Sequence, residues 1–237
     1  MSPRFLVFSD NEGCIIKAKG EEFDLSALLD LKELLRRSPN LAFAICTGRG
    51  VPYVEAMTQV LGIHRSGFPC VCEGGGVLYW PAKDRTELLV DRLPVSEILE
   101  RLPTGSFRVE PGKLCCLSLY PQSPLSVPEL AGLVTPYIDL NRFTFHVSSA
   151  AVDITRTGVH KGFGIGKALE AVDRTGATVV GIGDADNDLP MFDAVDYRAA
   201  PSNAMPSIKV RADFVSQFSD TRGVIDILEN LGRLGLS

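Results

Sequence analysis

Short runs of consecutive apolar residues alternate, over the first 80 positions, with segments whose apolar residues recur at helical spacing. The runs 5–8 and 41–46 are apolar throughout, which is typical of strands covered on both faces of a parallel sheet. Between them, leucines at helical spacing predict a helix over 24–37. A second helix is expected to begin near Pro52 and to reach about Leu61. This alternation predicts a parallel sheet with right-handed crossovers.

The pattern changes at Pro81, where we predict an inserted domain. Before it, two further strands, 68–72 and 77–80, are joined by a glycine-rich turn. From Pro81 onward, proline and charge become more frequent and the alternation is less regular. Residues 81–156 are therefore predicted to form a small α+β domain. Its expected elements are helices at 95–102 and 128–138, a strand at 113–120, and a hairpin of 143–147 and 150–154 around Ser148-Ser149.

The alternation of predicted strands and helices resumes near Gly158. A helix over 162–174 precedes the very apolar strand 178–182. A short helix at 189–192, strands at 197–200 and 213–215, and an amphipathic helix at 221–231 are expected to follow. We predict an α/β fold, in which a doubly wound, Rossmann-like parallel sheet is built from 1–80 and 157–237. The smaller α+β domain is inserted into it as a cap.

Size and charge restrict the possible partners. The chain has 237 residues, 45% of them hydrophobic, which is enough for a substantial core. A net charge of −5 argues against a broad surface for nucleic acid or anionic membrane. No run approaches the roughly 18 apolar residues of a membrane helix, and the N-terminus lacks the pattern of a secretory signal. We expect a cytoplasmic protein.

The six cysteines are predicted to be small buried residues rather than disulfide partners. Cys14 and Cys46 end apolar runs, and Cys115 and Cys116 are adjacent inside another. The C-x-C at Cys70 has no second Cys/His pair at zinc-ligand spacing, so a structural zinc is only a minor alternative.

Four polar segments are expected at one edge of the sheet, just after a strand or at the start of a helix. They are Asp10-x-Glu12, Thr47-Gly48-Arg49, Lys161 and the segment Asp184 to Asp188. Taken singly, acids after a strand are usually turn formers or helix caps. Open α/β sheets bind their ligands at the carboxyl ends of the strands, so together these segments predict a compact charged site.

The chemistry of these side chains points to phosphate and a metal ion. The carboxylates of Asp10, Glu12, Asp184 and Asp188 suit a hard cation such as Mg²⁺. Without a cation, gathering them would cause like-charge repulsion and raise their pKa values. Thr47 and the N–H groups that follow it precede a helix, where an anion is favoured, and Lys161 adds a positive charge. A metal, an anion cradle and a lysine together indicate phosphate handling.

These segments resemble the motifs of the haloacid-dehalogenase superfamily of aspartyl-phosphate phosphatases. Asp10 to Cys14 resembles the D-x-D-G-T signature, and Ile45 to Arg49 the second motif. Lys161-Gly162 resembles the third motif, and Gly183 to Met191 the fourth and most specific one. The resemblance covers both core segments.

The position and size of the insertion resemble the cap of the Cof-like branch, which also holds sucrose-phosphate and mannosyl-3-phosphoglycerate phosphatases. Within that branch, Ala200 to Ala204 and Ala212 to Ser216 are most similar to the archaeal type of phosphoglycolate phosphatase.

The resemblance implies a role for each site residue. Asp10 would be the nucleophile that takes the phosphoryl group, and Glu12 the acid and base that serves the leaving alcohol and then water. The substrate-binding residues would be Thr47, Gly48 and Lys161, with Asn187 supporting the loop. Mg²⁺ would be held by Asp10, Asp184, Asp188 and the backbone carbonyl of Glu12.

The chain departs from the family pattern at two positions. Glu12 stands where the family has its second Asp, and Cys14 where it has Thr. One extra methylene moves the carboxyl by roughly an ångström, which costs about a hundredfold in rate if nothing compensates. Metal binding through the backbone of residue 12 is expected to survive. Cys14 is interpreted as a small buried residue.

Other polar residues are left outside the predicted site. Arg49 is omitted because exposed arginines near helix starts are ordinary. The three histidines share no spacing. The glycines between Gly162 and Lys167 fit no nucleotide-loop pattern and predict close helix packing. Lys113, Arg108 and Arg156 are candidates for contacts to a leaving group, as charges of any cap would be.

The main hypothesis is a Mg²⁺-dependent phosphatase that acts on a small phosphate monoester, with a sugar phosphate or phosphoglycolate as the substrate class. The alternative is a phosphate-ligand binding or regulatory protein of the same fold, with turnover reduced because Glu12 replaces the usual Asp. A phosphotransferase such as a phosphomannomutase is a third option. The expected partner is a small phosphorylated metabolite, with no nucleic acid and no membrane. The chain is expected to be a monomer or a homodimer.

Overall fold

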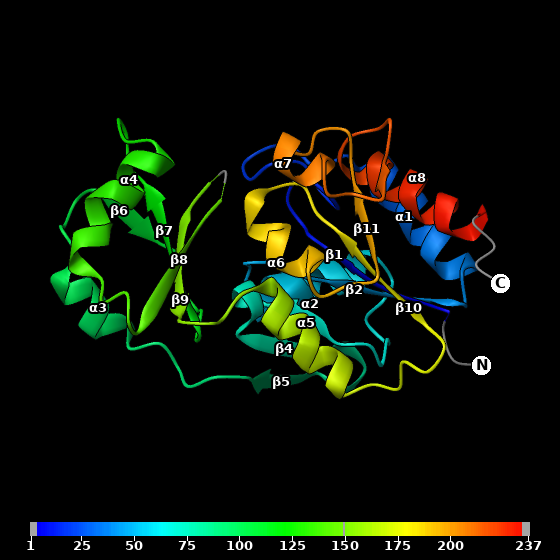
Figure 1. The fold of residues 1–237 in the computed structure, drawn as a ribbon, viewed down its shortest axis with the longest axis horizontal. Helices are drawn as coiled ribbons and strands as arrows, with labels where there is room; N and C mark the ends of the chain where they lie inside the picture. The colour runs from blue at the N-terminus through cyan, green and yellow to red at the C-terminus, as the bar shows by residue number, and fades with distance from the viewer. Residues whose placement is uncertain (1–3, 149, 234–237) are drawn as a thin grey trace.

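A parallel sheet of five strands forms the centre of the larger of two lobes (Figure 1). The structure, a computed structural model, describes residues 4–148 and 150–233. The strand order is β12-β11-β10-β1-β2, and all neighbouring pairs are parallel. The sheet confirms the predicted α/β class. Its strands are β1 (Phe5–Ser9), β2 (Leu41–Ile45), β10 (Thr178–Ile182), β11 (Tyr197–Ala200) and β12 (Phe214–Val215).

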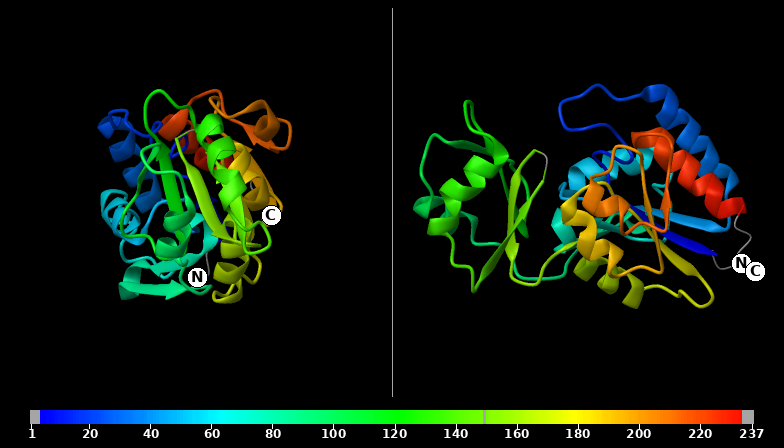
Figure 2. Two further views of the ribbon diagram at one scale, coloured as in Figure 1. Left: turned by 90° about the vertical axis from the view of Figure 1, so that its left-hand side faces the viewer. Right: turned by 45° about the horizontal axis from the view of Figure 1, so that its top comes forward.

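Helices cover both faces of this sheet, as its fully apolar strands require. Helices α1 (Leu25–Arg37) and α8 (Asp220–Arg233) pack against each other on one side, and α5 (Lys161–Glu170) lies on the opposite side (Figures 1 and 2). Asp24 caps α1 by accepting from the Ala27 N–H, 3.0 Å away. The remaining core helices are α2 (Val51–Val60), η4 (Asp186–Asp188), α6 (Leu189–Phe192) and α7 (Pro206–Lys209).

A separate antiparallel sheet adjoins the end of the parallel one. It consists of β3 (Cys70–Cys72), β4 (Val77–Trp80) and β5 (Arg85–Leu88), with η2 (Pro81–Lys83) between the last two. The predicted strands at 68–72 and 77–80 thus form an antiparallel pair. A parallel bridge between Cys46 and Val71 joins β3 to the end of β2. The third strand was not predicted because it carries a single apolar residue.

The tight turn predicted at the glycine run is confirmed as η1 (Glu73–Gly75). Gly75 has a φ of +114°, and a Cβ there would lie 2.1 Å from the carbonyl oxygen of His160. Only glycine fits this left-handed, closely packed position.

The smaller lobe is an antiparallel sheet of order β6-β7-β9-β8 with two helices on one face (Figure 1). It has its own apolar cluster, separate from that of the core. The predicted hairpin of β8 and β9 is present, although β9 begins at Val152 and Ser149 lies outside the described residues. The elements are α3 (Val95–Arg101), β6 (Phe107–Val109), β7 (Cys116–Pro121), α4 (Val127–Val134), η3 (Thr135–Tyr137), β8 (Phe143–Val147) and β9 (Val152–Arg156).

Two predicted helices are shorter in the structure. The helix expected over 128–138 breaks into α4 and η3 next to Pro136, which lacks the N–H that a continuous helix needs. The helix expected over 162–174 ends at Glu170, before the turn at Gly176, whose φ is +73°. The predicted domain boundaries, after residue 80 and after residue 156, stay a prediction. The strand β5 lies within the predicted insertion, but it pairs with β4 of the core.

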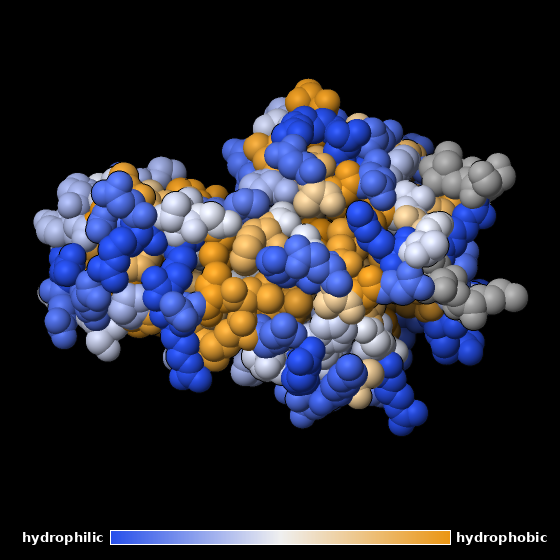
Figure 3. Space-filling view, turned by 60° about the horizontal axis from the view of Figure 1, so that its bottom comes forward, coloured by the Kyte–Doolittle hydropathy of each residue, from blue (hydrophilic) through white to orange (hydrophobic). Residues whose placement is uncertain are grey.

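Packing inside the core agrees with two further predictions. All six cysteines are buried and free. A Cβ on Gly162 would lie 2.1 Å from the Pro190 carbonyl oxygen, and one on Gly164 would lie 2.5 Å from Val71 Cγ1, so these glycines allow close helix packing. Apolar side chains also gather at the surface near the junction of the lobes (Figure 3). Across the described ranges, no helix is long and apolar enough to cross a membrane.

Candidate active site

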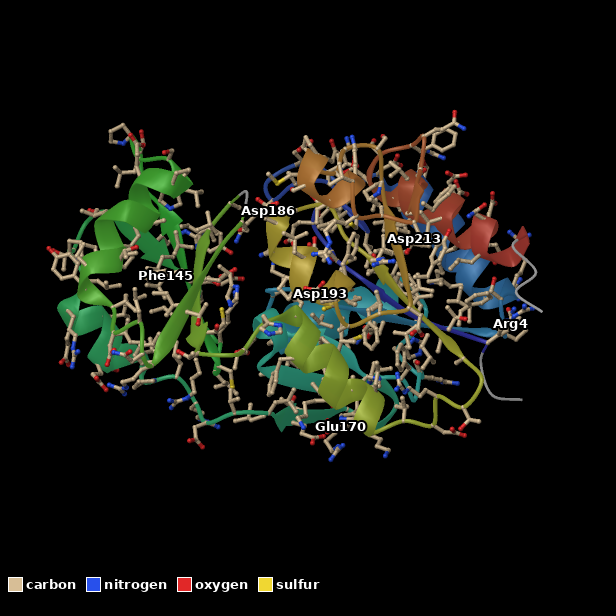
Figure 4. All side chains as sticks on the ribbon, in the orientation of Figure 1. Arg4, Phe145, Glu170, Asp186, Asp193 and Asp213 are labelled. Atoms are coloured by element: carbon tan, nitrogen blue, oxygen red, sulfur yellow. The ribbon has the colours of Figure 1, made fainter. Side chains whose placement is uncertain are left out.

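Neighbouring parallel strands deliver the predicted site residues to one edge of the sheet. Ser9 pairs with Ile182 on one side and with Ile45 on the other, so the three strands end at the same level. Asp10 follows β1, Thr47 follows β2 and Asp184 follows β10. Asp186, in the loop after β10, lies on the side of the core that faces the smaller lobe (Figure 4).

Lys161 lies between two buried carboxylates. Its Nζ is 2.8 Å from Asp10 Oδ1 and 2.5 Å from Asp188 Oδ1. Their exposed fractions are 3% for Lys161, 6% for Asp10 and none for Asp188. Burial, together with the charge of Asp188, raises the pKa of Asp10 well above its usual value. Burial opposes the charge on Lys161, but the carboxylates of Asp10 and Asp188 prevail and raise its pKa.

The loop after β10 is folded around Asp188. Its Oδ2 accepts the N–H groups of Asp184 at 2.9 Å and of Ala185 at 3.1 Å. A Cβ on Gly13, where φ is +78°, would lie 2.2 Å from Asp184 Oδ2, so the loop after β1 passes directly over this carboxylate. Burial, and next the charge of Asp188, raise the pKa of Asp184 to about 7. The glycine and the aspartates therefore pack as one unit.

Three of the predicted metal ligands fit a hard divalent cation. Oxygen atoms of Asp10, Asp184 and Asp188 all lie within 4.8 Å of one another. Burial and, after it, the crowding of carboxylates raise the pKa values of Asp10 and Asp184, as expected for acids that a cation would neutralise. The side chain of Glu12 is not part of this group, and a contribution from its backbone carbonyl stays a prediction.

Glu12 instead contacts Arg49. The guanidinium Nε of Arg49 donates a very short hydrogen bond to Glu12 Oε1, and the same guanidinium lies 4.8 Å from the centre of the Tyr53 ring. Sequence reasoning placed Glu12 in the site but left Arg49 out. The sequence does not show that Arg49 pairs with Glu12, which lies 37 positions earlier. Its place directly after the Thr47-Gly48 pair is the signal that could have indicated a role in the site.

The predicted anion-binding residues also lie here. Thr47 is buried, and its Oγ1 accepts the Arg49 N–H at 3.2 Å, whereas its own N–H is already bonded to the Val71 carbonyl. Gly48 lines the cavity that the carboxylates surround. Asn187 lines it as well, and its buried Oδ1 has no hydrogen-bond partner within the described part of the chain. This amide oxygen is available to a ligand.

The cavity lies between the two lobes and has a volume of about 70 Å³. The core side contains the carboxylates of Asp10, Glu12 and Asp184. The cap side contains charged and hydroxyl groups that sequence reasoning mostly missed, because they come from a different sheet. The cap residues that line it are Lys113, Tyr120, Ser148, Ala150, Ala151 and Asp153.

A buried carboxylate ties the cap connection to the core. Glu73 Oε2 accepts the N–H groups of Leu114 at 2.8 Å and of Cys115 at 2.6 Å. Burial raises the pKa of Glu73, although the two amide bonds oppose this rise. Glu73 has a φ of +53°, which turns the chain so that its side chain reaches the connection.

Comparison with known proteins shows what the chain is similar to. Residues 129–228 match the family described as haloacid dehalogenase-like hydrolase. This stretch holds part of the smaller lobe and the second core segment, and it is similar to the haloacid dehalogenase-like hydrolases. It is 27% identical over 229 residues to a phosphoglycolate phosphatase of Haloarcula marismortui, covering 92% of this chain and 96% of the relative. A phosphoglycolate phosphatase of Methanopyrus kandleri is 28% identical over 239 residues, covering 95% and 96%.

Solved structures share the fold of this chain. A Thermoplasma acidophilum protein superposes with a TM-score of 0.79 at 21% identity, covering 98% of this chain and 99% of that one. The sucrose-phosphatase of Synechocystis superposes with a TM-score of 0.66 at 16% identity, covering 97% and 98%. The similarity to this family and to the phosphoglycolate phosphatases supports a phosphatase, a phosphoric monoester hydrolase.

Proposed function

We propose that the chain is a Mg²⁺-dependent phosphatase that hydrolyses a small phosphate monoester of the sugar phosphate or phosphoglycolate class. The reaction would pass through an aspartyl phosphate on Asp10. The observation that carries this proposal is the position of Asp10, between Lys161 and the carboxylates of Asp184 and Asp188, at the base of a cavity.

The contacts of Asp10 suit a nucleophile. Its Oδ1 accepts the Asn11 N–H at 2.7 Å and lies 2.8 Å from Lys161 Nζ, so one carboxylate oxygen is fixed and Oδ2 is left to attack phosphorus. In the first step a bond forms between Asp10 Oδ2 and phosphorus while the ester oxygen leaves and takes a proton from Glu12. In the second step Glu12 takes a proton from water, which attacks phosphorus and releases phosphate and Asp10.

The other site residues would bind the phosphoryl group. Asp10, Asp184 and Asp188 would hold Mg²⁺, which supplies positive charge against the phosphoryl oxygens when it is bound. Lys161 provides a further positive charge, and the Thr47 hydroxyl and Gly48 amide would donate hydrogen bonds. The cap side of the cavity would limit the access of water.

The ion pair of Glu12 with Arg49 bears on both candidate functions. It fixes the longer side chain of Glu12 in one orientation beside Asp10, which supports acid and base catalysis by Glu12. The same ion pair also engages the Glu12 carboxylate in the absence of substrate, so that it is less free to transfer a proton. This would suit the alternative, a phosphate-binding protein with slow turnover.

Hydrolysis of 4-nitrophenyl phosphate tests the proposal. We expect Mg²⁺-dependent turnover by the wild type, at least a thousandfold reduction by Asp10→Asn, and no reduction by Asp193→Asn, an exposed aspartate paired with Arg211. Turnover that is independent of Mg²⁺, or equal in Asp10→Asn and the wild type, would refute the proposed function.

A further inference from the structure

A cluster of charges lies around the Glu12–Arg49 pair where the core meets the cap, and the chemistry proposed above uses none of its members beyond that pair. Three cations line the cavity there: Lys19 and Arg49 from the core, and Lys113 from the cap. All three surround the carboxylate of Glu110, which lies behind them and does not line the cavity.

Glu110 is bound on both of its oxygens. Oε1 lies 3.4 Å from Arg49 Nη1, and Oε2 lies 3.3 Å from Lys113 Nζ and 3.8 Å from Lys19 Nζ. The Tyr120 hydroxyl donates a very short hydrogen bond to the same Oε2. Because these contacts favour the ionised carboxylate over the cost of burial, the pKa of Glu110 falls to about 2. Glu110 is therefore negatively charged at any physiological pH.

The charges at this end of the cavity cancel. Glu12 pairs with Arg49, and Asp153 Oδ1 lies 4.0 Å from Lys113 Nζ, so three carboxylates face three cations. Their side chains are between 4% and 24% exposed, so water screens them only partly. Arg108 lies outside the cavity, 4.7 Å from the centre of the Tyr120 ring.

A second anion on the substrate would disturb this balance. At the phosphoryl end, Lys161 and the proposed Mg²⁺ would neutralise Asp10, Asp184 and Asp188, so no positive charge is left over there either. A carboxylate on the leaving alcohol would add a negative charge to a neutral, partly buried cluster in which each cation already has a carboxylate partner, which is unfavourable. The cavity volume of about 70 Å³ is also small against the roughly 300 Å³ at the lower end of ordinary ligand sites.

We propose that Glu110 is a specificity-determining residue that neutralises Lys19, Arg49 and Lys113, so that the enzyme selects compact phosphate esters with an uncharged leaving alcohol. The inference rests on the proposed function and separates the two substrate classes named there. Phosphoglycolate carries a carboxylate on its leaving alcohol, so the specificity of this chain differs from that in the names of its phosphoglycolate phosphatase relatives.

The test compares two small esters of similar size, glycerol 3-phosphate and 2-phosphoglycolate, in the full-length protein with Mg²⁺. We expect kcat/KM of the wild type to be at least about tenfold higher for glycerol 3-phosphate. In Glu110→Gln, which frees one positive charge, the ratio of kcat/KM for phosphoglycolate to that for glycerol 3-phosphate should rise about tenfold or more. Glu97→Gln, which also removes an ion-paired carboxylate of the cap, should leave the ratio as in the wild type.

Binding of glycolate, the leaving alcohol of phosphoglycolate, can be measured without turnover through the melting temperature. Glycolate at millimolar concentration should raise the melting temperature of Glu110→Gln more than that of the wild type. A wild type that prefers phosphoglycolate, or a ratio that is equal in Glu110→Gln and Glu97→Gln, would overturn the inference and leave the proposed function intact. If no phosphate ester, 4-nitrophenyl phosphate included, is hydrolysed with Mg²⁺, the proposed function itself fails. The wild-type comparison decides the matter even if Glu110→Gln does not fold.

Discussion

Replacing Glu110 by Gln should lower stability at neutral pH and make the protein less sensitive to acid. The carboxylate has a pKa of about 2 in the folded protein, against 4.5 as its ordinary value. At about 1.4 kcal/mol per pKa unit, the folded contacts of the charged form contribute at most about 3.5 kcal/mol. The side chain is 17% exposed, so screening reduces this value, and we expect a loss of about 1–3 kcal/mol at pH 7.

The sign of the pH dependence follows from the lowered pKa. The contribution of Glu110 is fully present above its unfolded pKa and is lost as the pH falls from about 4.5 towards 2. Protonation of the unfolded chain removes about 1.4 kcal/mol of it by pH 3.5. The difference in stability between the wild type and Glu110→Gln should therefore shrink by that amount between pH 7 and pH 3.5.

Urea unfolding at the two pH values measures this difference. Glu170→Gln is the control, because this glutamate of α5 is exposed and forms an ion pair with the exposed Lys167 (Figure 4). A loss below about 0.5 kcal/mol at pH 7, or a difference from the wild type that stays constant down to pH 3.5, would refute the reasoning.

Two further substitutions probe catalysis and packing. Glu12→Gln should lower kcat for an alkyl phosphate by about 10²–10⁴. The loss should be much smaller for 4-nitrophenyl phosphate, because its leaving group needs no proton. Equal losses of kcat on both esters would exclude Glu12 as the acid. Gly75→Ala should cost more than about 2 kcal/mol in thermal unfolding, because its Cβ would lie 2.1 Å from a backbone carbonyl at a φ of +114°. Gly166→Ala, which meets nothing within 4 Å, is its control and should be neutral or slightly stabilising, and similar melting temperatures for the two variants would contradict the packing argument.

The parallel sheet could be predicted because its central strands carry an unmistakable pattern. The strands β1 and β10 are continuous apolar runs that end in acids, so both the strand and the position of the acids follow from local sequence. The strands β5 and β6 could not be predicted in this way. Arg85 to Leu88 is mostly polar and Phe107 to Val109 is too short to show a period, and both form only because a neighbouring strand offers hydrogen bonds.

The same distinction applies to the site. Asp10, Lys161 and Asp188 were predicted because each follows a strand or begins a helix near a recognisable motif, and the structure brings their charged atoms into contact. Arg49 and Glu110 could not be predicted as partners, because they lie 61 positions apart and their pairing depends on how the two lobes meet.

The bond between Glu73 and the chain at Leu114 determines how the lobes can move. Because two short hydrogen bonds hold this connection to the core, it would act as a pivot in any separation of the lobes. If the lobes separate to admit substrate, Lys113, next to this pivot, moves through a short arc, whereas Tyr120 on β7 travels further. The cation nearest the pivot would then stay beside the core throughout such a motion, while the cap side of the cavity opens away from it.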